Sequence, residues 1–214
     1  MAKLNQDAIQ GEIKSAYVIA LFDKGKELLE SNGYKIISLE ENARLRMQEG
    51  GDSLISKSGN WVKEDFIYTK DKGVYLTKNS PICENAKKAT TCNDKCREFY
   101  LTDEQIEKSL ANSLLLLRTA EKSQIPTNDF KNNEITNFIF GSSAEDYGNF
   151  LKENGIKDMP IWFVDLENMP SWFGDLKNKS FARKVFFRGF DCWSGLYSPN
   201  WGLGYNYESR GVKK

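Results

Sequence analysis

The sequence predicts a single domain of the α+β class. Stretches typical of helices and strands follow one another as helix, strands, helices, and then strands and loops, rather than as alternating β-α-β units. The chain has 214 residues, of which 40% are hydrophobic, which is enough to bury a substantial core. We therefore expect one domain over residues 1–214, with mixed small sheets and packed helices. Residues 1–50 form its helical and strand N-terminal part, and residues 185–212 form a loop-rich C-terminal region.

In the N-terminal part, apolar residues recur every three to four positions and predict an amphipathic helix over residues 7–32. The pair Asn32-Gly33 is a suitable C-cap for that helix. The alternation of residues 34–39 predicts a short strand. Residues 40–47 are expected to form a second helix, ended by two glycines at positions 50 and 51.

The middle of the chain predicts a sheet followed by helices. Residues 53–56, 61–68 and 73–78 favour strands, and the Lys-Asp-Lys-Gly turn between the last two predicts a hairpin. Residues 79–97 are expected to form a polar loop. The remaining predicted elements are a helix over about 102–121 that begins with a capping box of Thr102 and Gln105, a short helix after Asn133, a helix over 144–154 begun by Ser143 and ended by Gly155, a strand over 160–164 and a loop over 169–174.

The C-terminal region is rich in aromatic residues and glycines. Residues 185–187 are β-branched or aromatic and predict a strand, whereas residues 191–208 keep neither a helical nor a strand period. Tyr, Ser, Gly and Asn, which are frequent here, are also the residues that antibody-like binding surfaces favour. We therefore interpret this region as a surface that displays side chains.

Composition excludes several functions. The 30 basic and 30 acidic residues cancel, so the net charge gives no reason to expect nucleic acid or an anionic membrane as a partner. The chain has no histidine, the commonest general base and metal ligand. The apolar run at residues 16–22 is too short to cross a bilayer, and acidic residues precede it. We expect a soluble protein without a classical signal peptide.

Two kinds of chemistry remain open from the residues themselves. Four thiolates could bind zinc, but their spacing is atypical; a disulfide is a comparable alternative, and free thiols are expected in preference to both, so no metal is predicted. Four acidic residues near the C-terminal region could act as an acid and a base, although surface charge is the commoner explanation. No phosphate-binding motif occurs, so no cofactor is expected. The cysteines are Cys83, Cys92, Cys96 and Cys192, and the acidic residues are Asp165, Glu167, Asp175 and Asp191.

The C-terminal region also resembles a known family. Phe187-Arg188-Gly189, the run Trp201-Gly202-Leu203-Gly204-Tyr205 and the ending Arg210-Gly211-Val212 enclose residues without an obvious pattern. This frame resembles the variable region of diversity-generating retroelement proteins, particularly the archaeal AvpA-type variable proteins. The resemblance implies a C-type lectin fold with a ligand-binding face whose side chains are rewritten by adenine-directed mutagenesis, and it implies no enzymatic activity.

The resemblance further implies which residues bind and what they bind. Trp201 and Glu208 belong to the frame, and the partner is expected to be the surface of a protein or another macromolecule. Calcium is not expected, because the tripeptides that bind it in lectins are absent. An enzyme of formylglycine-generating-like architecture, acting through carboxylates or a thiol, is the alternative function. The expected variable binding residues are Asp191, Cys192, Trp193, Ser194, Tyr197, Ser198, Pro199, Asn200, Tyr205, Asn206 and Tyr207.

Overall fold

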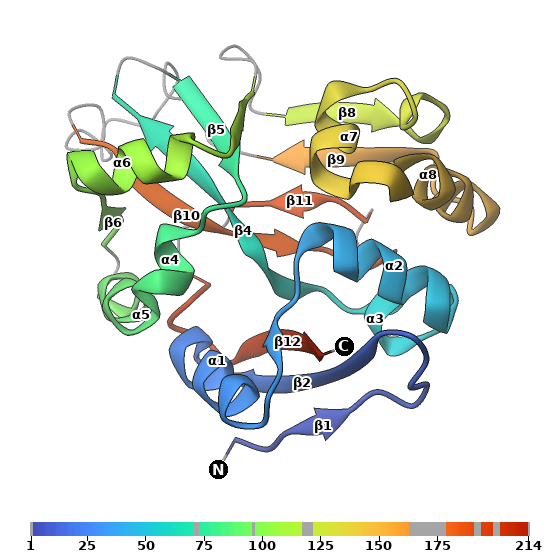
Figure 1. Cartoon of the computed structure of the whole chain (residues 1–214), viewed down its shortest axis with the longest axis horizontal. Coiled ribbons are helices and arrows are strands. Elements are labelled where there is room, and N and C mark those ends of the chain that lie inside the picture. The colour runs from blue at the N-terminus through green and yellow to red at the C-terminus, as the bar shows by residue number, and fades with distance from the viewer. Residues whose placement is uncertain are drawn as a thin grey trace.

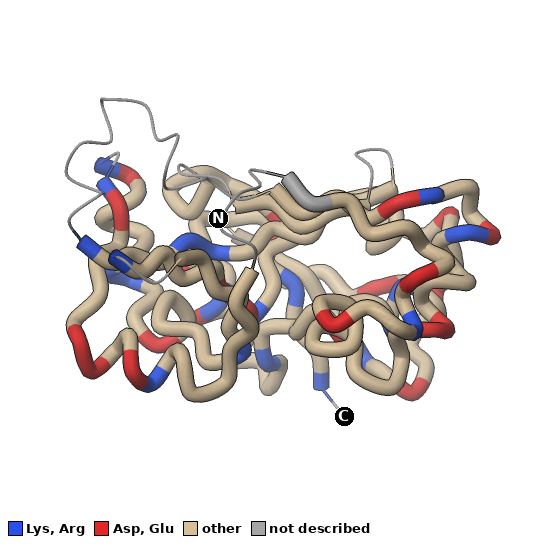
Figure 2. The backbone as a smooth tube through the Cα atoms, turned by 90° about the horizontal axis from the view of Figure 1, so that it is seen from above, with Lys and Arg blue, Asp and Glu red and all other residues tan. Residues whose placement is uncertain are grey.

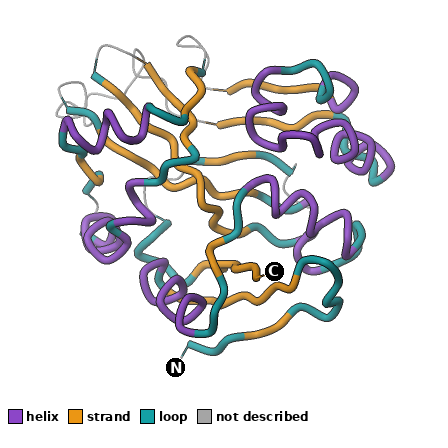
Figure 3. Tube along the Cα trace, in the orientation of Figure 1, coloured by secondary structure: helices purple, strands orange, loops and turns teal. Residues whose placement is uncertain are grey.

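A computed structural model of the chain describes residues 2–70, 73–95, 97–116, 122–162, 179–190, 194–198 and 202–213; of residues 122 and 123 it describes the backbone alone. Within these ranges the chain forms one mixed sheet with helices packed on both of its faces (Figures 1 and 3). The main path of the sheet runs β1-β2-β12-β4-β10-β11-β9-β8.

The bounds of the elements are as follows. The helices are α1 (Phe22–Ser31), α2 (Leu39–Glu49), α3 (Leu54–Lys57), α4 (Pro81–Glu84), α5 (Ala86–Asp94), α6 (Asp103–Leu110), α7 (Glu134–Phe140) and α8 (Ala144–Glu153), with short 3-10 turns at Thr127–Asp129 and Gly141–Ser143. The strands are β1 (Asn5–Gln6), β2 (Lys14–Ala20), β3 (Lys35–Ile36), β4 (Asn60–Thr69), β5 (Gly73–Thr77), β6 (Phe99–Tyr100), β7 (Ser113–Leu115), β8 (Lys122–Pro126), β9 (Asp158–Trp162), β10 (Phe181–Phe187), β11 (Leu196–Tyr197) and β12 (Tyr207–Lys213).

The first predicted helix is wrong over its first half. Its second half is α1, which ends at Asn32 and Gly33 as expected, and Gly33 has a φ of 79°. Its first half instead contains β2, which pairs with β12 along its whole length, from Ala20 opposite Tyr207 to Lys14 opposite Lys213. The β-branched residues of β2 suit this pairing, so a partner strand at the other end of the chain overrides the helical spacing.

Other elements that were predicted from capping residues and turn sequences are present in the structure. Ser38 and Glu41 form a capping box at the start of α2, and Gly50 follows its end with a φ of 87°. The hairpin of β4 and β5 is confirmed, as are the capping box of Thr102 and Gln105 and helices α7 and α8. A strand is also present near the predicted range 160–164, but it begins two residues earlier and is described over Asp158–Trp162.

Three other predictions are corrected. Residues 54–57 form the short helix α3 rather than a strand. The expected polar loop over 79–97 contains helices α4 and α5, because the Ser80 side chain accepts a hydrogen bond from the Cys83 N–H and Pro81 suits the first helical turn. The helix begun at Thr102 ends at Leu110 instead of 121, since residues 113–115 pair with β5 as β7. The predicted loop over 169–174 lies outside the described residues.

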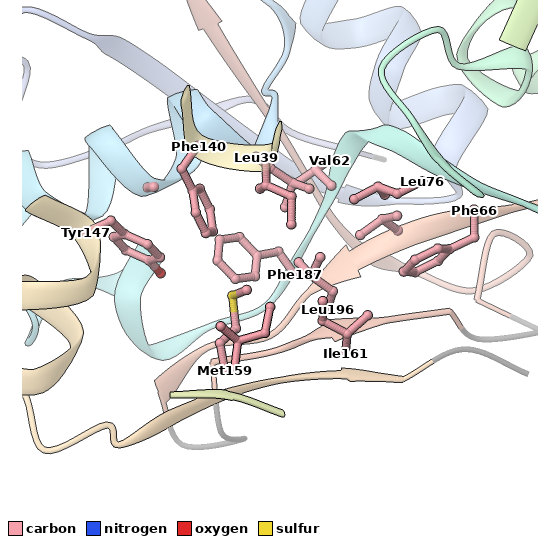
Figure 4. Close-up of a cluster of buried hydrophobic side chains, with 14 of the residues drawn as sticks. Leu39, Val62, Phe66, Leu76, Phe140, Tyr147, Met159, Ile161, Phe187 and Leu196 are labelled. Carbon is pink, nitrogen blue, oxygen red and sulfur yellow. The ribbon is translucent and has the colours of Figure 1, made fainter. Parts of the chain in front are cut away.

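The sheet separates two hydrophobic clusters. One contains residues of α2, α7 and α8 together with Val62 and Phe187, and Figure 4 shows its central side chains. The other contains residues of α1 and α5 together with Trp61 and Ala182. Because successive side chains of a strand point to opposite faces, β4 and β10 contribute to both clusters.

Candidate functional site

The register of four strands places large aromatic residues side by side on one face of the sheet. Trp162 of β9 lies opposite Tyr197 of β11, Tyr197 lies opposite Phe186 of β10, and Phe186 lies opposite Trp61 of β4. Directly opposite residues project from the same face of a sheet. Tyr207, at the start of β12, adds a fifth ring at the Trp61 end. We call these five residues the aromatic row.

The rings of the aromatic row contact one another mostly edge to face. Their centroids are 6.3 Å apart for Trp162 and Tyr197, 4.9 Å for Trp61 and Phe186, and 5.6 Å for Phe186 and Tyr207. This is the preferred range for aromatic pairs in proteins. Trp61 is buried, with 1% of its surface exposed, whereas the other four rings are partly exposed. Four of the five rings therefore form a partly exposed surface, and the buried ring of Trp61 connects that surface to the second hydrophobic cluster.

The neighbouring position on each of three strands belongs to the hydrophobic core. Ile161, Leu196 and Phe187 are paired with one another in the same way, and all three are fully buried. They point into the cluster drawn in Figure 4. A shift of one residue along these strands thus separates this buried cluster from partly exposed rings, so Tyr197 can change without altering the cluster.

Arg188 extends the aromatic row at its β9 end. Its guanidinium lies over the Tyr197 ring at 4.6 Å and over the Trp162 ring at 5.3 Å, measured to the ring centroids. A hollow of about 300 Å³ adjoins Trp162 and is lined by Gln124, Gly155, Ile156, Lys157, Asp158 and Pro160. The described face therefore combines aromatic surface, one stacked cation and a small depression.

The segment that follows β10 is held by hydrogen bonds from the buried side chain of Arg46, a residue of α2. Its guanidinium donates hydrogen bonds to Ser194 Oγ at 3.1 Å, to Tyr147 Oη at 3.1 Å and to the Arg188 carbonyl oxygen at 3.0 Å. It also lies 4.0 Å from the centroid of the Phe187 ring. Arg46 is fully buried, and this desolvation lowers the pKa of its guanidinium from the usual value.

Close backbone approach fixes the same segment. A Cβ atom on Gly189 would lie 2.0 Å from the carbonyl oxygen of Lys57, so only glycine fits at this position. Ser194 adopts a φ of 43°, and its N–H donates to the Gly189 carbonyl oxygen at 3.0 Å. The turn between β10 and β11 is therefore tied down at both of its described ends.

Strand β12 is anchored by buried charges. Arg210 is fully buried and donates to Glu208 Oε1 at 2.8 Å, and it also pairs with a carboxylate oxygen of Asp7. Burial alone would lower the pKa of Arg210, but the two carboxylates raise it above its usual value. Glu208, expected in the frame, thus lies in an ion-pair network that joins the two ends of the chain.

The predicted binding residues fall into three groups. Tyr205, Asn206 and Tyr207 are exposed, with 58% of the surface of Tyr205 and 37% of that of Tyr207 accessible, and Tyr197 is half-buried. Asp191, Cys192, Trp193, Pro199 and Asn200 lie outside the described residues. The third group, Ser194 and Ser198, is buried.

The expectation that Ser194 and Ser198 are displayed is wrong. They are 0% and 4% exposed, and both hydroxyl groups are used internally. Ser194 accepts from Arg46, and the Ser198 hydroxyl lies 2.9 Å from Tyr68 Oη. Tyr68 stacks in turn on Phe181 with 4.5 Å between the ring centroids. These two serines connect the chain around β11 to the core.

Sequence reasoning missed several members of the site. Trp162, Phe186 and Trp61 did not stand out as site residues, because their role follows from strand register. The pairs 161–162 and 186–187 did carry a usable signal. In each pair two large apolar residues are adjacent in a strand, so they project to opposite faces of the sheet and cannot both enter the same cluster.

The cysteines and acidic residues do not assemble into a site within the described chain. Cys83 and Cys92 are free thiols, and the Cys83 sulfur lies 3.0 Å from the ammonium group of Lys184. Cys96, Cys192 and the four acidic residues noted in the sequence lie outside the described residues. Among the described residues no group of three or more potential ligands could hold a metal ion.

Charges of both signs are distributed over the described chain. Figure 2 shows Lys and Arg positions beside Asp and Glu positions at both ends of the molecule. In the part of the chain described here, no helix is long and apolar enough to cross a membrane.

This arrangement of a mixed sheet, flanking helices and a loop-rich C-terminal segment returning to a final strand defines the C-type lectin fold. The chain is similar to a solved structure described as showing the accommodation of massive sequence variation in Nanoarchaeota by the C-type lectin fold. The TM-score is 0.68, the alignment covers 94% of this chain and 98% of that chain, and the sequence identity is 18%. No protein-family model matches the chain, and no curated protein matches it. The fold implied by the resemblance in the C-terminal region is therefore confirmed.

Proposed function

We propose that the chain is a ligand-binding protein of a diversity-generating retroelement, with variable residues displayed on the aromatic row and its surroundings. The observation that carries this proposal is the alternation between displayed and core residues. Phe186, Tyr197 and Trp162 lie on the surface, whereas the adjacent residues Phe187 and Leu196 are buried. Such a scaffold allows its surface to change while its core stays constant.

The chemistry of the face suits a macromolecular partner. Tyrosine, tryptophan and arginine dominate the residues that contribute most to protein interfaces, because they offer large and rigid contact area. Tyr207 of the aromatic row is exposed, and so is Tyr205, two residues before it in the chain. The fold similarity to a protein with massive sequence variation supports the same class of function.

The supports of the face account for tolerance to change. Arg46, Gly189 and the Arg210 ion pairs hold the backbone through groups outside the exposed side chains. Rigid support of variable residues is what a binding site with changing contacts requires.

The proposal is tested by sequencing the gene from many members of a natural population, together with its genomic surroundings. Changes should concentrate between residues 191 and 207, with a reverse transcriptase gene and a template repeat nearby. Because Ser194 and Ser198 are buried, we expect fewer kinds of residue there than at Tyr205, Asn206 and Tyr207. Invariance throughout residues 191–207 would contradict the proposal.

A further inference from the structure

Arg188 differs from the other well-packed arginines in what surrounds its guanidinium. Arg183 donates to Glu98, Arg210 donates to Glu208, and Arg46 donates to two hydroxyl groups and a carbonyl oxygen. Arg188 is half-buried and contacts two aromatic rings, but within the described ranges its guanidinium meets no hydrogen-bond acceptor.

Stacking leaves the strongest binding groups of this side chain unused. A guanidinium carries five N–H donors in its plane, and an aromatic ring attracts the charge without accepting these hydrogen bonds. The rings of Tyr197 and Trp162 restrict the plane of Arg188, so less conformational entropy remains to be lost on binding. The matching acceptor is a planar carboxylate, which can accept two parallel hydrogen bonds.

From this geometry we infer that Arg188 is a constant anchor of the binding face and binds an Asp or Glu carboxylate of a protein partner. The inference rests on the proposed function. Arg188 precedes the segment proposed to vary, and its stacking partner Trp162 also lies outside that segment, so this anchor would be available to every variant of the protein. Its stacking on Tyr197 would change wherever that residue varies. The variable residues around it would then select among partners that present an acidic side chain.

The surrounding charges favour one carboxylate over a nucleic-acid backbone. Binding of a phosphate backbone requires several cations along a groove. The hollow beside Trp162 instead contains one cation and one anion, Lys157 and Asp158. A single stacked arginine between aromatic rings resembles the central residue of a protein interface, where exclusion of water strengthens a charged hydrogen bond.

The experiment uses a random peptide library displayed on phage and selected on the immobilised full chain. Selected peptides are then synthesised, and their dissociation constants are measured for the wild type, Arg188→Gln and Arg188→Lys. Arg44→Gln is the matched control, because Arg44 already pairs with Glu12 at 3.1 Å away from the row. Circular dichroism and thermal unfolding verify that each variant folds.

We expect the selected peptides to be enriched in Asp or Glu. Replacing the key acidic residue of a peptide by its amide, or Arg188 by Gln, should weaken binding by about 10- to 100-fold, and the two changes together should cost no more than one alone. Arg188→Lys should restore only part of the affinity, because lysine cannot form the paired hydrogen bonds. Arg44→Gln should leave the affinity unchanged.

Failure of the inference can be distinguished from failure of the proposed function. Peptides whose binding is lost in Tyr205→Ala or Tyr207→Ala but is unaffected by Arg188→Gln would overturn the inference and leave the proposed face in place. Absence of any selected peptide, or binding insensitive to all of these changes, would overturn both. If Arg188→Gln does not fold, the peptide substitution decides alone, and an unchanged affinity overturns the inference.

Discussion

The adjacent residues Leu196 and Tyr197 of β11 offer a direct test of the separation between the hydrophobic core and the face that we propose to bind ligands. Leu196 is 0% exposed and belongs to the large hydrophobic cluster. Truncating such a leucine to alanine costs about 2–5 kcal/mol, through lost burial and the cavity that remains. In a chain of this length each kcal/mol lowers the melting temperature by about 2–4 °C. Leu196→Ala should therefore lower it by about 6–12 °C if the cost is about 3 kcal/mol.

Tyr197→Ala should cost much less. The change removes one ring contact with Trp162 and the stacking of Arg188, which at a half-exposed site amount together to about 1 kcal/mol. Urea unfolding followed by circular dichroism gives both free energies, and the slopes show whether unfolding stays cooperative. If Tyr197→Ala were as destabilising as Leu196→Ala, the strand register that separates core from surface would be wrong, because a slip of one residue exchanges the two faces.

Two further predictions concern the support of the fold. Gly189→Ala should destabilise the protein by about 1–3 kcal/mol, since its Cβ would collide with the Lys57 carbonyl oxygen, and an unchanged melting temperature would contradict this close approach. Burial raises the pKa of Glu64 from 4.5 to about 7, against the opposing effect of its backbone hydrogen bonds, so its ionisation destabilises the folded state progressively as the pH rises between these values. The free energy of unfolding of Glu64→Gln should therefore rise relative to that of the wild type by up to about 3 kcal/mol between pH 4.5 and pH 8, as measured by denaturant unfolding at the two pH values. A difference that does not depend on pH would refute the assignment.

Elements with strong local signals could be predicted from the sequence. The capping box at Thr102, the glycines after α1 and α2 and the turn sequence that predicts a hairpin act over a few residues, and the structure contains the capping box, both glycines and the pairing of β4 with β5. Strand β2 and strand β7 could not be predicted in the same way. Their conformation depends on pairing with β12 and β5, and β12 lies at the opposite end of the chain.

The candidate site shows the same division. The C-terminal region was identified from its composition and its frame, and the fold that the resemblance implied is confirmed. Which of its residues face outward depends on distant partners, such as Arg46 and Tyr68, that hold Ser194 and Ser198 inside. A short polar residue between aromatic residues looks the same in sequence whether its hydroxyl meets water or a buried side chain.

The position of β12 makes the sheet depend on the C-terminal end of the described chain. This last strand lies between β2 and β4, and its Arg210 neutralises Asp7 near the start of the chain (Figure 1). A chain that ends early, inside residues 191–206, lacks the strand that joins β1 and β2 to the rest of the sheet. Premature termination within the proposed variable segment would thus remove the partner of β2 and the ion pair of Arg210 with Asp7, and we expect such a truncated chain to lose the fold.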